Sequence, residues 1–183
     1  MQLSGLQKMV LFRLREWLDM EEIYIGVGSN VGDRRANLNH ASRRLSEYMV
    51  ITNKSQVYET EPQYLLNQAK FLNAVVCGHT ELEPLDMLNK LKQLETALGR
   101  VAGPRNGPRL IDLDLLYYGR RCISTDILTV PHPRIQERYF VLRPLLDIAP
   151  SLKHPTNGKT VKQLISELPI DTRRATPALM GLE

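Results

Sequence analysis

Cysteine and large aromatic residues are scarce in this chain of 183 residues, which has two Cys, one Trp and three Phe. Two cysteines in a chain of this length make no disulfide framework. No Cys-x-x-Cys pair or Cys/His cluster predicts a zinc site. We expect Cys77 and Cys122, which lie in apolar, strand-like contexts, to be buried thiols in a reducing compartment.

Long uninterrupted apolar runs are also absent, which argues against a membrane span. Residues 1–21 have apolar side chains at helical spacing, but charged residues interrupt them, and a secretory cleavage pattern is missing. We therefore expect a cytoplasmic protein that carries a helical N-terminal extension over residues 1–21.

Runs of five or six like charges are missing too, so a nucleic-acid-binding tail is not indicated despite the net charge of +4. The chain contains no GxxxxGK[ST] phosphate loop. The glycines of residues 26–32 have the spacing GxGxxxG, and no acid ends a second parallel strand about 20 residues later, so a Rossmann site is not supported.

Apolar periodicity predicts an order of elements that runs β-α-β-β-α-β. Strands are expected at 22–28, 50–52, 55–60, 71–80 and 109–118, and helices at 38–48 and 84–98. The buried face of the second helix should consist of Leu85, Leu88, Leu91, Leu94 and Leu98. This order is typical of a ferredoxin-like α+β fold, with a mostly antiparallel sheet and helices on one face.

Two shorter helices are expected near 136–147 and 160–167, and residues 170–183 look like a loose tail. With no internal repeat and no long linker, one domain should span 22–168, followed by a tail at 169–183.

Two acids two residues apart, Asp112 and Asp114, interrupt the apolar strand that starts at Arg109. Positions i and i+2 of a strand share a face, so both carboxylates should lie side by side. Such a pair is favourable if it binds a divalent cation, and Mg²⁺ typically takes one or two carboxylates together with substrate phosphates. The alternative is a solvated strand face.

A loop rich in arginine, glycine and proline comes directly before this pair. It contains Arg100, Arg105 and Arg109 and no acidic residue. Guanidinium groups form paired hydrogen bonds with phosphate oxygens, and Mg²⁺ bridges the oxygens of a polyphosphate. The loop and the acid pair together therefore indicate a polyphosphate ligand. The alternative is an exposed basic loop attracted to an acidic strand. His132, between two prolines, could be structural or could contact phosphate.

Five segments in order resemble 6-hydroxymethyl-7,8-dihydropterin pyrophosphokinases of folate biosynthesis. They are Tyr24-Ile-Gly-Val-Gly-Ser-Asn30, Tyr58-Glu-Thr-Glu-Pro62, Gln68-Ala-Lys-Phe-Leu-Asn-Ala74, Gly107-Pro-Arg-Leu-Ile-Asp-Leu-Asp114 and Val130-Pro-His132. The resemblance runs from about Ile23 to Leu168. It implies the ferredoxin-like fold and the transfer of pyrophosphate from ATP to the hydroxymethyl group of a reduced pterin, which releases AMP.

The resemblance also implies roles for individual residues. Asp112 and Asp114 would bind two Mg²⁺ ions with ATP. The pterin would contact Thr60, Pro62, Phe71, Asn73 and Phe140. ATP would contact Glu95, Arg100, Arg109, Thr129, His132 and Arg138, of which Arg100 and Arg109 would take part in catalysis with the two acids. The partners would be these small molecules alone, without nucleic acid or membrane, and the chain would be a monomer or weak dimer.

Three positions depart from the family pattern, which has Trp, Arg and Tyr where this chain has Asn106, Ile127 and Pro133. The loop after Arg100 is also one residue shorter. These departures leave open an inactive homologue that serves as a scaffold. The basic balance and the fold class leave open a second rival, an RNA-binding ferredoxin-like module, although the chain lacks the aromatic motifs that stack bases in such modules.

Overall fold

The computed structural model describes residues 20–101, 103–104 and 106–182. The helices are α2 (Arg34–Leu45), α3 (Pro84–Ala97), α4 (Tyr139–Ile148), α5 (Val161–Glu167) and the short 3-10 turns η1 (Ile135–Glu137) and η2 (Ile170–Thr172). The strands are β1 (Glu21–Ser29), β2 (Val50–Lys54), β3 (Gln56–Thr60), β4 (Phe71–Thr80), β5 (Asp112–Tyr118), β6 (Ile123–Ser124), β7 (Thr129–Val130) and β8 (Thr176–Gly181). The predicted extension at residues 1–21 falls almost wholly outside the described residues.

A six-stranded sheet forms the centre of the molecule, in the order β5-β1-β4-β3-β8, with β2 also paired to β4. Every pairing in this sheet is antiparallel. The predicted α+β class and the order of the first elements are therefore confirmed. The long β4 lies at the centre and pairs with β1 on one side and with β2 and β3, in succession, on the other.

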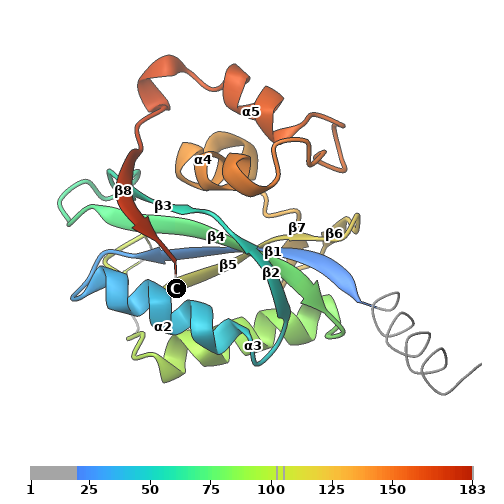
Figure 1. Ribbon diagram of the computed structural model, residues 1–183, viewed down its shortest axis with the longest axis horizontal. Coiled ribbons are helices and arrows are strands. Elements are labelled where there is room, and N and C mark those ends of the chain that lie inside the picture. The colour runs from blue at the N-terminus through green and yellow to red at the C-terminus, as the bar shows by residue number, and fades with distance from the viewer. Residues whose placement is uncertain (1–19, 102, 105, 183) are drawn as a thin grey trace, which may run out of the picture.

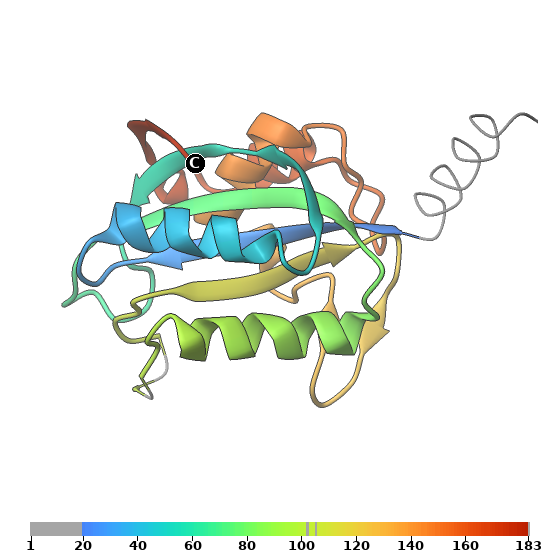
Figure 2. The same ribbon diagram turned by 60° about the horizontal axis from the view of Figure 1, so that its bottom comes forward.

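Helices cover both faces of this sheet: α2 and α3, the helices of the predicted β-α-β-β-α-β unit, share one face as expected, and the two shorter helices α4 and α5 cover the other. Figure 1 shows α2 and α3 below the sheet and α4 and α5 above it, and Figure 2 shows α3 running beneath β5. Each face has its own apolar core. Ile25, Leu38 and Leu91 belong to the core under α2 and α3, whereas Leu116 and Leu142 belong to the core under α4 and α5.

The buried face of α3 is rotated relative to the leucine pattern. Met87, Leu91 and Leu94 are buried, but Leu85 is 46% exposed. In the first turn it is Pro84, directly before Leu85, that is buried. A buried carboxylate, Glu95, completes this face and points toward the functional residues described below.

The C-terminal segment is a strand and not a loose tail, which corrects the prediction for residues 170–183. β8 pairs with β3, with Tyr58 opposite Pro177 and Glu59 opposite Thr176. Ala178 and Leu182 pack against the core on the α2 side. Main-chain pairing to an open sheet edge needs little side-chain periodicity, which explains why the sequence pattern did not reveal it.

Two local predictions also changed. Cys77 is buried in β4, as expected, but Cys122 is exposed in the turn after β5. The strand predicted from Arg109 begins only at Asp112, because Asn30 binds the backbone of Arg109 and holds it outside the sheet.

Candidate active site

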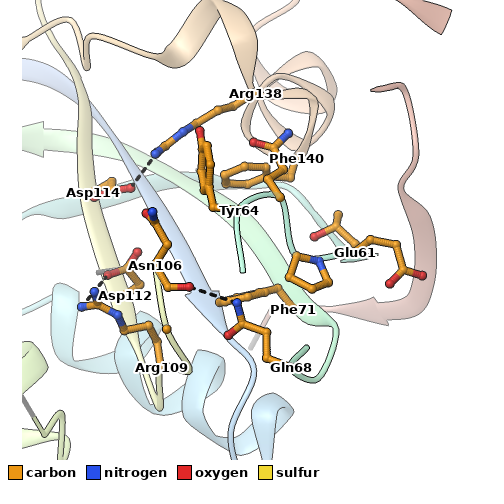
Figure 3. A pocket seen from close by; sticks show the side chains of 14 residues that line it. Glu61, Tyr64, Gln68, Phe71, Asn106, Arg109, Asp112, Asp114, Arg138 and Phe140 are labelled. Carbon is orange, nitrogen blue, oxygen red and sulfur yellow. Dashed lines mark hydrogen bonds and ion pairs between the residues drawn. The ribbon is translucent and has the colours of Figure 1, made fainter. Parts of the chain in front are cut away.

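A pocket lies where the segment 61–70, the segment 106–109, the start of β5 and the start of α4 meet (Figure 3). Its walls include both acids and two of the predicted aromatic residues. The lining residues are Thr60, Glu61, Pro62, Gln63, Tyr64, Gln68, Phe71, Asn106, Gly107, Arg109, Asp112, Asp114, Arg138 and Phe140. Residues far apart along the chain thus converge on one cavity.

The sheet itself supplies the floor of this region. In β1, Gly28 lies opposite Asp112 of β5 on one side and opposite Asn73 of β4 on the other. Gly26 lies opposite Asp114 in the same way. Since glycine has no side chain, the sheet surface is open at these two positions. A second hollow, which shares the acids and Phe140 with the main pocket, lies over them. A β-carbon at position 28 would lie 2.9 Å from Asn73 Oδ1.

Asp112 and Asp114 share one face of β5, as predicted, while Leu113 between them is fully buried on the other face. Burial, together with the neighbouring charges of Asp114 and Glu95, raises the pKa of Asp112 to about 6. Like charges this close disfavour the doubly ionised pair unless cations offset them. The pair is therefore a site of concentrated negative charge.

Arginines supply part of that offset. Arg100 Nη1 lies 3.1 Å and Arg109 Nη1 3.9 Å from Asp112 Oδ1. Arg138 Nη1 lies 3.6 Å from Asp114 Oδ2, and its side chain is only 8% exposed. Three of the predicted arginines thus surround the two acids, although Arg105 lies outside the described residues.

Glu95 connects α3 to the acid strand. Its side chain is 2% exposed, and Oε1 accepts a hydrogen bond of 2.7 Å from the backbone N–H of Leu113. The carboxylate also contacts the guanidinium of Arg100. Glu95 does not line the pocket, so its direct effect is on the position of Arg100 and β5.

His132 lies behind Arg138, with Nε2 3.5 Å from Arg138 Nη1. Burial lowers the pKa of His132, and the nearby arginines act in the same direction. A neutral imidazole next to two cations is the expected result. Neither His132 nor Thr129 lines the pocket in this structure.

The predicted pterin residues come from β3, the segment 61–70, β4 and the start of α4. Asn73 is buried, and its Nδ2 donates a 2.7 Å hydrogen bond to Thr60 Oγ1. Phe71 and Phe140 line both the main pocket and the connected hollow. Thr60 and Pro62 complete this wall.

Among the pocket residues to which sequence reasoning assigned no role are Tyr64, Gln68 and Asn106. Asn30 Nδ2 donates to Gln68 Oε1, and Gln68 Nε2 donates to the carbonyl of Asn106, each at 3.0 Å. This chain of hydrogen bonds joins the segment 61–70 to the segment 106–109. Only Gln68 fell within a quoted segment, and nothing in its spacing indicated a bridging role.

The carboxylate oxygens of Asp112 and Asp114 suit a hard divalent cation that is also bound to phosphate. Two carboxylates on one strand face are the protein ligands that Mg²⁺ commonly uses in such complexes. Within the described parts of the chain, His, Cys, Asp and Glu form no group of three or more that could hold a metal ion. Substrate oxygens would have to complete the coordination.

Comparisons with known proteins show which family the chain resembles. The family model described as 7,8-dihydro-6-hydroxymethylpterin-pyrophosphokinase (HPPK) matches residues 24–150. The 2-amino-4-hydroxy-6-hydroxymethyldihydropteridine pyrophosphokinase of Aquifex aeolicus is 40% identical over 148 residues, which cover 81% of this chain and 92% of that protein. The protein of the same name from Bacillus subtilis is 43% identical over 140 residues, covering 75% of this chain and 84% of that protein.

Longer relatives match over part of their length. The folate synthesis bifunctional protein of Arabidopsis thaliana is 46% identical over 139 residues. That match covers 75% of this chain and 29% of the Arabidopsis protein. The chain spans only 22% of the folic acid synthesis protein of Dictyostelium discoideum. A crystal structure of an HPPK-DHPS in complex with substrates shares the fold, with a TM-score of 0.68 at 17% identity, covering 80% of this chain and 43% of that one.

None of the helices in the described part of the chain is long and apolar enough to cross a membrane.

Proposed function

The chain belongs to the 7,8-dihydro-6-hydroxymethylpterin-pyrophosphokinase family, and from this premise we propose that it transfers pyrophosphate from ATP to 6-hydroxymethyl-7,8-dihydropterin. The products are the pterin diphosphate and AMP, and the reaction belongs to folate biosynthesis. One observation carries the proposal: the acid pair Asp112 and Asp114 opens into the same cavity as the rings of Phe71 and Phe140.

The pterin binds at the aromatic side of the cavity. Phe71 and Phe140 contact its flat faces, and each such ring contact contributes about 0.5–1.5 kcal/mol beyond the burial of area. Asn73 binds the polar edge, because one amide offers both a donor and an acceptor to the mixed pattern of a pterin. Its bond to Thr60 fixes which group of the amide faces the ligand. Backbone groups near Thr60 and Pro62 complete this edge.

The phosphates of ATP bind at the acid side. Asp112 and Asp114 would hold two Mg²⁺ ions, which would supply charge neutralisation for the phosphate oxygens. Arg100, Arg109 and Arg138 bind the remaining oxygens through charge-assisted hydrogen bonds. Glu95, Thr129 and His132 act on the nucleotide side, and Glu95 does so by positioning Arg100.

In the reaction, the hydroxymethyl oxygen of the pterin forms a bond to the β-phosphorus of ATP. The bond from that phosphorus to the oxygen of the α-phosphate breaks, AMP leaves, and the hydroxyl proton passes to solvent. Positioning and electrostatic stabilisation dominate in this class of reaction. The guanidinium groups around the cavity offset the negative charge on the transferred group, and the ring contacts hold the pterin oxygen in line.

A cytoplasmic location, a monomeric or weakly dimeric state and the domain limits 22–168 stay predictions. Both rival functions, an RNA-binding module and an inactive scaffold, share one expectation: no chemistry on ATP.

The test is to incubate the protein with ATP, Mg²⁺ and 6-hydroxymethyl-7,8-dihydropterin and to separate nucleotides by chromatography. We expect AMP to form in a one-to-one ratio with pterin diphosphate, and only when the pterin is present. Absence of AMP from a folded, pterin-binding protein would support the scaffold function instead.

A further inference from the structure

Tyr64 lies in a segment whose large apolar side chains, Leu65 and Leu66 among them, are exposed. The segment 61–70 joins β3 to β4 without a helix or strand. Tyr64 lines the pocket together with Phe71 and Phe140, although 47% of its surface is exposed. It belongs to neither hydrophobic core. Its position therefore needs an explanation other than folding.

Two guanidinium groups hold this ring. The guanidinium carbon of Arg134 lies 4.8 Å from the centre of the Tyr64 ring, and that of Arg138 lies 6.0 Å from it. Arg138 is also 5.4 Å from the centre of the Phe140 ring. Cations within about 6 Å of a ring face attract it. Figure 3 shows Tyr64 beside Phe140, next to the Arg138 side chain.

The guanidinium of Arg138 and the backbone of Arg134 are themselves held by further contacts. Arg138 is buried and pairs with Asp114, and it lies 3.5 Å from His132 Nε2. The backbone N–H of Arg134 donates to His132 Nδ1 at 3.2 Å. His132 thus connects the two arginines that contact Tyr64. The ring is held in place from the same side of the pocket that carries the acid pair.

We propose that Tyr64 is a further positioning residue for the ring of the substrate, a third aromatic wall beside Phe71 and Phe140. This inference rests on the proposed function, because it assumes that a flat heterocycle occupies the cavity. Tyr64 covers that heterocycle from the solvent side and excludes water from it. Arg134 and Arg138 keep the ring at the pocket instead of in solution.

The test measures pterin affinity by fluorescence titration, without turnover. Tyr64→Leu removes the ring and should raise the Kd for 6-hydroxymethyl-7,8-dihydropterin about fivefold to tenfold, as expected for one lost aromatic contact. Tyr64→Phe keeps the ring and should stay within about twofold of the unmodified protein. The affinity for a non-hydrolysable ATP analogue with Mg²⁺ should not change in either variant.

Arg134→Gln provides a second, independent change, because Arg134 lies outside the pocket lining. It should weaken pterin binding about twofold to fourfold by loosening Tyr64. Leu66→Ala is the matched control: Leu66 is in the same segment, is 73% exposed and does not line the pocket. Pterin affinity of this control should equal that of the unmodified protein.

The results separate two failures. If the unmodified protein binds no pterin, the proposed function is wrong. If it binds pterin and Tyr64→Leu binds equally tightly, only the role of Tyr64 is wrong. Equal losses in Tyr64→Leu and Tyr64→Phe would also contradict that role, since the ring would then not be the group that matters.

Discussion

Arg100 Nη1 lies 3.1 Å from Asp112 Oδ1, and the same guanidinium contacts the buried carboxylate of Glu95. Arg138 has the equivalent relationship to Asp114 at 3.6 Å. Each acid of the pair therefore has its own arginine. Because a guanidinium binds carboxylate and phosphate oxygens in the same geometry, these arginines lie within reach of any polyphosphate that the acids bind through a cation.

Replacing Asp114 by Asn keeps the shape of the side chain and removes its charge. We expect Mg²⁺-dependent AMP formation to fall at least about 100-fold, because charge stabilisation by a bound metal is worth several kcal/mol. Pterin affinity should stay nearly unchanged, since Phe71, Asn73 and Phe140 remain. Turnover and calorimetric pterin binding are the two measurements. Turnover like that of the unmodified protein would exclude Asp114 as a metal ligand.

Gly28 tests the open floor of the site. In Gly28→Ala the new methyl group would meet Asn73 Oδ1 at 2.9 Å, so the amide must move away from its position at the pterin edge. We expect pterin affinity to fall about tenfold, comparable to the loss in Asn73→Ala, because one polar contact is lost. ATP-analogue affinity should fall less.

Gly26→Ala is the control for that change. Gly26 lies on the same strand as Gly28, but its new methyl group would lie 3.4 Å from the flexible end of Leu116 and away from Asn73. Pterin affinity should fall by less than about threefold. Equal losses in both alanine variants would point to general strain in β1 and not to the amide of Asn73.

Glu95 should contribute to stability as well as to function. Glu95→Ala leaves the buried N–H of Leu113 without its acceptor, at a cost of about 1–3 kcal/mol in the free energy of unfolding. Glu95→Gln keeps an acceptor oxygen and should lose less. Urea denaturation measures both. Glu47→Ala, which removes an exposed ion pair with Arg44, should leave the urea denaturation midpoint nearly unchanged.

Arg109 offers a test of the phosphate side. Asn30 holds its backbone through two hydrogen bonds, so Arg109→Ala shortens the side chain without releasing the segment. The rate of AMP formation should fall tenfold or more, because a charge-assisted hydrogen bond is worth roughly 1.5–3 kcal/mol. Arg120→Ala removes an exposed arginine far from the pocket and should leave the rate unchanged. An unchanged rate in Arg109→Ala would argue against its contact with phosphate.

The sequence predicted the order of the first elements along the chain and the acid pair well, because both depend on local patterns. Alternation around Leu113 placed Asp112 and Asp114 on one strand face, and the structure has them there. Asn73, Phe71 and Phe140 were assigned from the family resemblance alone. Their convergence depends on the packing of α4 against β4, which spacing along the chain does not encode.

Long-range main-chain contacts account for what the sequence did not reveal. β8 joins the sheet through backbone hydrogen bonds to β3, so its residues needed no periodic pattern. Tyr64 looked like an ordinary loop residue because its partners, Arg134 and Arg138, come about 70 residues later. The exposed Cys122 follows a strand whose apolar pattern ends just before it.

Transfer from ATP labelled at the β-phosphorus tests the central claim most directly, because the label distinguishes pyrophosphoryl transfer from transfer of the terminal phosphate. The account predicts that the label moves into the pterin product and that unlabelled AMP appears in equal amount. Label found in ADP, with a pterin monophosphate as the other product, would contradict it.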